Sequence, residues 1–86
     1  MITKECIISN ETGIHARPAT TIAKKVAPLS ASVTLEAKGK TANAKSLIGI
    51  LSLGVVKGDV IKVTVDGDNE EAICTELVEF ISSINE

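Results

Sequence analysis

Aromatic residues are almost missing from the sequence, and this scarcity argues against one large class of function. The 86 residues include no Trp, no Tyr and a single Phe, Phe80. Proteins that bind single-stranded nucleic acid stack bases on aromatic side chains and usually present a strongly basic surface. Here nine basic residues are set against eleven acidic ones, which leaves a net charge of −2 at pH 7. We therefore expect no direct contact with nucleic acid.

Long apolar runs are also missing. The longest mainly apolar stretch, residues 47–56, is interrupted by Ser52 and is far shorter than the roughly 20 residues that a membrane-spanning helix needs. Near the N-terminus, Lys4 and Glu5 interrupt the apolar residues before the core of a secretory signal could form. The sequence therefore predicts a cytoplasmic protein without membrane insertion.

Cysteine and histidine are too few to suggest a metal site or a disulfide framework. The chain has two cysteines, Cys6 and Cys74, and one histidine, and it contains no Cys-x-x-Cys pair. In a reducing compartment a free cysteine commonly acts as a small buried apolar residue. We therefore expect two buried free thiols rather than a Cys6–Cys74 disulfide, and neither a metal nor another cofactor.

Apolar residues recur with strand and helix periods along what we expect to be a single domain over residues 1–86. Strands are expected over residues 2–8, 32–36, 40–43 and 60–66, and helices over residues 16–27, 47–53 and about 69–84. The element order β-α-β-β-α-β-α predicts an α+β open-faced two-layer sandwich. In such a fold, three helices cover one face of a largely antiparallel four-stranded sheet. Periodicity alone does not reveal which strands are neighbours.

Boundary residues support the first and last helices. Pro18 suits the first turn of the helix over residues 16–27, and Pro28 ends that helix. Asp68 or Asn69 is expected to cap the last helix. The side chains that this last helix turns inward are expected to be Ile73, Leu77, Phe80, Ile81 and Ile84.

The only histidine and the only arginine, His15 and Arg17, lie two residues apart where the first helix should begin. A helix N-terminus presents backbone N–H groups and a partial positive charge, so it readily binds phosphate. Histidine can carry a phosphoryl group, whose oxygens could accept hydrogen bonds from the N–H groups of Ala16 and Arg17 and from the guanidinium. The alternative is that His15 merely takes the place of a helix-capping residue and that Arg17 is a solvated charge. The residue types match phosphoryl transfer, and both interpretations remain open at this point.

The short helix over residues 47–53 carries apolar residues on two sides. Leu47, Ile48 and Leu51 lie on one side, and Ile50 and Leu53 lie on another. A surface helix of about two turns normally buries one stripe, which would leave the other exposed as a surface for a partner. The alternative is a helix that is buried nearly all round. Ser46 precedes this helix as an expected N-cap, and a phosphate at that position would also be electrostatically favourable.

Two segments resemble the signatures of the HPr family, the histidine-containing phosphocarriers of the bacterial phosphoenolpyruvate-dependent sugar phosphotransferase system. Residues 13–19, Gly-Ile-His-Ala-Arg-Pro-Ala, resemble the active-site signature. Residues 43–54, Asn-Ala-Lys-Ser-Leu-Ile-Gly-Ile-Leu-Ser-Leu-Gly, resemble the regulatory-serine signature. The similarity extends over the whole chain and implies an antiparallel sheet with strand order 1-4-2-3.

The resemblance implies a specific transfer reaction. His15 would accept a phosphoryl group on Nδ1 from the phosphohistidine of Enzyme I and pass it to a histidine on a sugar-specific IIA domain. Arg17 would stabilise the phosphoryl group. A protein of this kind is a stoichiometric carrier and not a true enzyme.

The resemblance also implies a regulatory site and a surface for partners. Ser46 matches the serine that HPr kinase/phosphorylase modifies in many low-GC Gram-positive bacteria, where the modified protein is a corepressor for a catabolite control transcription factor. The residues expected to contact partners are Ile14, Thr20, Lys24, Lys45, Leu47, Ile48 and Leu51. Lys25 is expected to join Lys24 and Lys45 in a basic rim beside the apolar side of the short helix.

Two other classes of function remain as alternatives. The first is a regulatory paralogue that signals mainly through phospho-Ser46, or a protein of nitrogen-related phosphotransfer. In the family that the sequence resembles, the close paralogue with this signalling role and no role in sugar transport lacks the histidine, so His15 argues against it. The second is a small acid–base enzyme built on His15, which the lack of a second catalytic group nearby in the sequence disfavours.

Overall fold

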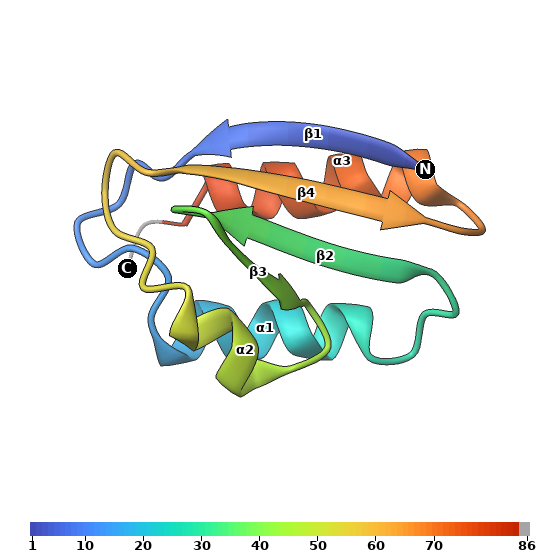
Figure 1. Cartoon of the computed structure of the whole chain (residues 1–86), viewed down its shortest axis with the longest axis horizontal. Helices are drawn as coiled ribbons and strands as arrows, with labels where there is room; N and C mark the ends of the chain where they lie inside the picture. Colours follow the sequence, from blue (N-terminus) through green and yellow to red (C-terminus); the bar gives the residue numbers. More distant parts are fainter. Residues whose placement is uncertain (85–86) are drawn as a thin grey trace.

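The computed structural model describes residues 1–84, which form seven elements in the predicted order (Figure 1). The elements are β1 (Ile2–Ile7), α1 (Ala16–Val26), β2 (Ser32–Ala37), β3 (Lys40–Asn43), α2 (Leu47–Ser52), β4 (Val60–Asp66) and α3 (Glu70–Ser82). Their boundaries agree closely with those expected from the apolar periodicity and from the flanking Gly, Pro and Ser residues.

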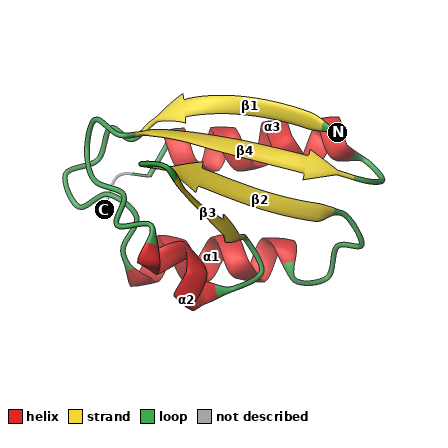
Figure 2. Ribbon diagram, in the orientation of Figure 1, coloured by secondary structure: helices red, strands yellow, loops and turns green. Residues whose placement is uncertain are grey.

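The four strands form one antiparallel sheet in the order β1-β4-β2-β3, and the helices gather on one of its faces (Figure 2). The central strand β4 pairs on one side with β1, where Ile2 faces Val65, and on the other side with β2, where Val33 faces Val65. Strands β2 and β3 form a hairpin whose turn residues, Lys38 and Gly39, have φ angles of 56° and 77°. Two positive φ angles suit a tight hairpin turn. The predicted open-faced sandwich and its strand order are confirmed.

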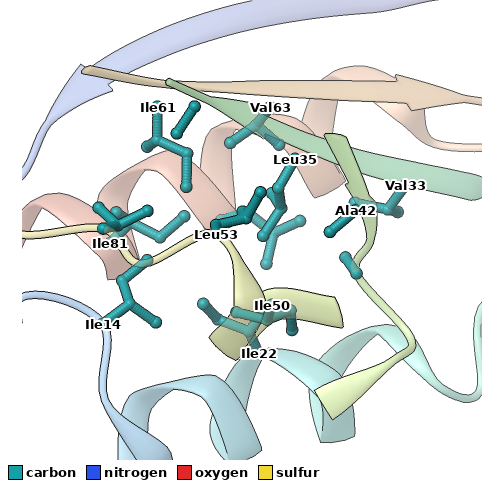
Figure 3. Packing of buried hydrophobic residues seen from close by; sticks show 14 of the residues in the cluster. Ile14, Ile22, Val33, Leu35, Ala42, Ile50, Leu53, Ile61, Val63 and Ile81 are labelled. Atoms are coloured by element: carbon teal, nitrogen blue, oxygen red, sulfur yellow. The ribbon is translucent and has the colours of Figure 1, made fainter. Parts of the chain in front are cut away.

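The core lies between the sheet and the helices (Figure 3). The inward-facing residues of the two central strands include Val33, Leu35, Ile61, Val63 and Val65. Residues from the helices and loops that meet them include Ile14, Ile22, Ile50, Leu53 and Ile81. Complete burial of one such aliphatic side chain contributes about 1.5–3 kcal/mol to folding. The opposite face of the sheet is open and polar, with exposed Glu5 and Glu36 on either side of Lys62.

Helix α3 differs in detail from the prediction. Leu77, Ile81 and Ile84 are buried as expected, whereas Ile73 and Phe80 are only partly buried, and Cys74 completes the inward stripe. Cys74, Leu77 and Ile81 share one face of the helix, so Ile73 and Phe80, one residue before Cys74 and Ile81, are turned to its flank, while Ile84 lies beyond the end of the helix.

The cap of α3 is also different from the prediction. Asn69 occupies the N-cap position, but its side chain makes no capping hydrogen bond. Its backbone is left-handed, with φ of 60°, whereas a capping side chain normally needs an extended backbone to reach the first turn. The carboxylate of Glu70 instead accepts a hydrogen bond from the N–H of Gly67.

Cys6 and Cys74 are both buried free thiols, as the sequence predicts. The Sγ of Cys74 donates a hydrogen bond to the carbonyl oxygen of Val63 at 3.4 Å. Burial raises the pKa of both thiols, which favours the less reactive protonated form. Across residues 1–84, no helix has the length and apolar character needed to cross a membrane.

Candidate functional site

The loop that leads into α1 is held in place by close packing at Gly13. This glycine has φ of 64°, and a Cβ atom there would overlap the carbonyl oxygen of Val55. The N–H of Ile14 donates to that same oxygen at 3.3 Å. Only glycine allows both the left-handed backbone and this close approach. The loop after α2 therefore supports the segment that presents His15.

His15 is the N-cap residue of α1, with an extended backbone, and its side chain makes no capping hydrogen bond. The residue is partly exposed, while its Nε2 atom is buried. A buried Nε2 is not available to a phosphoryl donor, which leaves Nδ1 as the ring nitrogen that could react with a partner.

The first turn of α1 can hold an anion beside this ring. It contains no acidic side chain, and its first intrahelical hydrogen bond runs from the N–H of Ala19 to the carbonyl oxygen of His15. Before Ala19, the residues of the first turn that have a backbone N–H group are Ala16 and Arg17, because Pro18 has none. Both residues are exposed. The local positive end of the helix and the Arg17 guanidinium favour a phosphoryl group at this position.

The rest of the first turn belongs to the same surface. Thr20 is partly exposed, and its hydroxyl donates a hydrogen bond to the carbonyl oxygen of Ala16 at 2.7 Å. Residues four apart share one face of a helix, so Thr20 lies one turn after Ala16 on the same side of α1. The structure therefore brings together His15, Ala16, Arg17 and Thr20.

Helix α2 presents the exposed apolar side that its sequence pattern predicts. Ile50 and Leu53 are each 1% exposed. The residues on the other side, which we call the α2 strip, are Leu47, Ile48 and Leu51, with exposures of 38%, 80% and 38%. Helix α2 packs against β3 and against α1, the helix whose N-cap is His15 (Figure 1). The alternative of a helix buried nearly all round is excluded.

Ser46 caps α2 as expected. Its Oγ accepts a hydrogen bond from the N–H of Gly49 at 3.0 Å. A Cβ at Gly49 would lie 3.2 Å from that Oγ, so the absence of a side chain there gives the serine its room. Ser46 as a whole residue is exposed.

The three lysines of the expected basic rim make different contacts. Lys24 is exposed, and the ammonium of Lys45 donates to the carbonyl oxygen of Leu29 at 2.8 Å. Lys25 differs from the prediction, because its ammonium lies 3.4 Å from the Glu76 carboxylate and 5.7 Å from the centre of the Phe80 ring. One residue turns a helix by about 100°. Lys25 therefore faces α3 and is not part of a basic rim beside the α2 strip.

Ile14 is another correction to the predicted contact surface. Its side chain is 6% exposed and belongs to the core, where Figure 3 shows it close to Ile81. The Ile14 side chain therefore anchors the loop before α1 to the core. A partner cannot reach it without disturbing the core.

Two supporting residues were not identified from the sequence. Asn10, 7% exposed, donates a hydrogen bond from Nδ2 to the carbonyl oxygen of Gly13 at 2.8 Å. Asp59 accepts one from the N–H of Val56 at 2.9 Å and lies 3.2 Å from the Lys38 ammonium. The Val56 hydrogen bond, and then Lys38, lower the pKa of Asp59. An asparagine at the start of a Gly-containing turn is a known turn signal, and it could have indicated Asn10.

Metal ligands do not gather at this site. Throughout residues 1–84, no three His, Cys, Asp or Glu side chains lie close enough together to hold a metal ion.

The fold and the site together define a class of protein: a small open-faced sandwich that presents one histidine at a helix N-terminus suited to a phosphoryl group. The chain matches the family model described as "PTS HPr component phosphorylation site" over residues 2–83. It is 37% identical to the phosphocarrier protein HPr of Borreliella burgdorferi over 86 residues, which is the whole of both chains. The chain therefore belongs to the HPr family of phosphocarriers of the phosphotransferase system.

Solved structures agree with this assignment. HPr from Thermoanaerobacter tengcongensis superposes with a TM-score of 0.88 at 41% identity, covering 96% of this chain and 93% of that chain. Crh, the catabolite repression protein of Bacillus subtilis, superposes with a TM-score of 0.75 at 28% identity, covering 100% of this chain and 99% of the other. The first likeness is the stronger in both fold and sequence.

Proposed function

We propose that the chain carries a phosphoryl group on His15, which it accepts from phospho-Enzyme I and delivers to sugar-specific IIA domains. The observation that carries this proposal is the position of His15 at the start of α1, with Nε2 buried, which leaves Nδ1 to take part in the transfer. Membership of the HPr family supports the same chemistry. Because both proposed partners act on the cytoplasmic side of sugar uptake, we place this single domain in the cytoplasm.

The transfer exchanges one phosphorus–nitrogen bond for another. The lone pair of His15 Nδ1 attacks the phosphorus of the donor phosphohistidine, and the donor's P–N bond breaks with its electron pair returning to the donor ring. Negative charge on the equatorial oxygens is offset by the N–H groups of Ala16 and Arg17, by the helix dipole and by the Arg17 guanidinium. In the second transfer the acceptor histidine of the IIA domain attacks the phosphorus, and the P–N bond to His15 breaks with its electron pair returning to Nδ1. The protein is consumed and regenerated as a stoichiometric reactant.

Partners would dock on the surface next to His15. The α2 strip would supply apolar area, and we expect Thr20, Lys24 and Lys45, which are exposed or partly exposed, to supply polar and positive groups. Charge at such a rim mainly increases the rate of encounter. A small apolar strip with a polar rim suits brief contacts, which a carrier needs because it must leave one partner to reach the next.

The experiment that tests this function is incubation with Enzyme I and phosphoenolpyruvate. Intact mass should show one added phosphate, which acid removes, and His15→Ala should abolish it. Arg17→Ala should still accept phosphate, but more slowly, since the guanidinium stabilises the group without forming the bond. Phosphate on the His15→Ala protein would overturn the proposal.

A second, regulatory function is supported by Ser46. Ser46 is an exposed residue at the N-terminus of α2, where a phosphate would be favoured electrostatically. The likeness to a protein named for catabolite repression points the same way. We propose that an HPr kinase/phosphorylase modifies Ser46 and that the product binds a catabolite control transcription factor. This function adds to the carrier role, because His15 is present.

A further inference from the structure

Beyond the residues that touch the phosphoryl group, we infer that Asn10 is a positioning residue for His15. Its side-chain amide holds the peptide plane between Gly13 and Ile14 and so sets where the imidazole lies over the first turn of α1. Among residues 1–84, Asn10 is the only polar residue that is buried. It belongs to the loop after β1 and takes no direct part in the proposed transfer. The inference rests on the proposed function for its kinetic consequence only.

The peptide between Gly13 and Ile14 is hydrogen-bonded at both ends. Asn10 Nδ2 donates to its carbonyl oxygen at 2.8 Å, and its N–H donates to the carbonyl oxygen of Val55 at 3.3 Å. In a trans peptide these two groups point in opposite directions from one rigid plane. The two bonds therefore restrain rotation of the plane from opposite sides. Without the Asn10 amide, only the longer bond to Val55 would remain.

The surrounding turn leaves little freedom to compensate for such a loss. Asn10 Nδ2 also lies 3.2 Å from the hydroxyl of Thr12, and the N–H of Gly13 donates to the carbonyl oxygen of Asn10 at 3.3 Å. Gly13 is itself buried against Val55, so its carbonyl oxygen could not simply exchange Asn10 for bulk water. The plane would shift, and His15, attached through Ile14, would shift with it.

Such a shift matters because transfer needs the attacking nitrogen in line with the donor's P–N bond. A displacement of about 1 Å from the reactive geometry can lower a rate by up to about 100-fold. Binding of a partner depends on a wider surface and should change little. A positioning role therefore predicts a loss in kcat with KM retained.

The test compares two variants of Asn10 with a stability control. Asn10→Ala removes the amide, and Asn10→Leu keeps a similar volume without a donor, which separates hydrogen bonding from packing. The control is Val65→Ala, because Val65 is fully buried at the end of β4 that pairs with Ile2, away from this loop. Denaturant unfolding first establishes that all three variants are folded and how much stability each has lost.

Three readouts then follow His15 in each protein: its ring signals by NMR, its uptake of phosphate from phosphoramidate, and kcat and KM with phospho-Enzyme I. For both Asn10 variants we expect altered ring signals, and both rates lowered about tenfold, with KM within about twofold of the wild type. The Val65→Ala protein should lose stability but keep the wild-type ring signals, the wild-type rate with phosphoramidate, and the wild-type kcat and KM.

Wild-type ring signals and rates in both Asn10 variants would overturn the inference, as would an equal loss of rate in Val65→Ala. The carrier proposal fails separately, if the wild-type protein takes phosphate from phosphoramidate but not from phospho-Enzyme I. In that case the ring signals and the phosphoramidate rates still decide the role of Asn10.

Discussion

Ser46 shows how much depends on a single hydroxyl group. Its Oγ caps α2 through Gly49, so the group proposed for phosphorylation is also a structural one. For Ser46→Ala we expect the free energy of unfolding to fall by about 1 kcal/mol, the usual cost of losing an N-cap. Intact mass with HPr kinase/phosphorylase and ATP should show no added phosphate, while uptake on His15 continues.

Ser52→Ala is the matched control for this residue. Ser52 is an exposed serine of the same helix, and its hydroxyl donates to the carbonyl oxygen of Gly49 at 2.7 Å. This variant should gain one phosphate as the wild type does. Kinase-dependent phosphate on the Ser46→Ala protein would show that Ser46 is not the modified residue.

Helix α2 is the element whose two sides have different tasks. Ile50 and Leu53 attach it to the core, while the α2 strip remains exposed for a partner. Ile48, at 80% exposure, contributes little to folding, so Ile48→Ser should change the unfolding free energy by less than about 0.5 kcal/mol. If the strip contacts phospho-Enzyme I, loss of this apolar contact should raise KM about fivefold to tenfold, with kcat unchanged, in a steady-state transfer assay.

Val60→Ser provides the comparison, since Val60 is 46% exposed but lies in β4. Its KM should equal that of the wild type. Equal values for both variants would mean that the α2 strip is not the docking surface.

At the scale of the whole molecule, a few surface ion pairs join segments that are far apart in the chain. Asp59 and Lys38 link the loop before β4 to the β2–β3 hairpin, and the N-terminal ammonium of Met1 lies 2.9 Å from the Glu70 carboxylate. The Val56 hydrogen bond and Lys38 lower the pKa of Asp59, and the N-terminus lowers that of Glu70. Glu70 in turn raises the pKa of the Met1 amine.

The direction of these shifts predicts how stability varies with pH. Carboxylates with lowered pKa values stabilise the fold above their unfolded pKa, and this stability is lost as pH falls through the folded value. The amine, with its raised pKa, stabilises below its unfolded value and loses this effect as pH rises. The unfolding free energy from denaturant titrations should therefore be nearly constant between about pH 5 and 8 and fall on both sides.

Asp59→Asn isolates one of these contributions. The variant should be less stable than the wild type on the plateau and should approach it at acid pH, so its acid-side decline is smaller. Asp68→Asn, an exposed change before α3, should keep the wild-type profile. An unchanged acid-side decline in Asp59→Asn would contradict the prediction.

The sequence predicted a feature correctly where that feature depends on residues close together in the chain, and it failed where distant segments decide. His15 and Arg17 are two residues apart, so a helix start was enough to place them on one turn. The cap at Ser46 and the two sides of α2 follow from spacings of three and four residues. Ile14 and Lys25 were misplaced, because loop packing and α3 decide which way they point. Asn69 failed as a cap because its backbone turned left-handed.

The sequence by itself thus determined which elements form, and it placed one histidine at a helix start beside an arginine, in a chain with almost no aromatic residues. These features depend on periodicity and on neighbours along the chain. Only the tertiary structure decided that the carbonyl oxygen of Val55 holds the peptide plane before Ile14, and that Nε2 of His15 is buried. The physical reason is that the loop after α2 is far from the start of α1 in the chain, and only packing of the common core brings the two together.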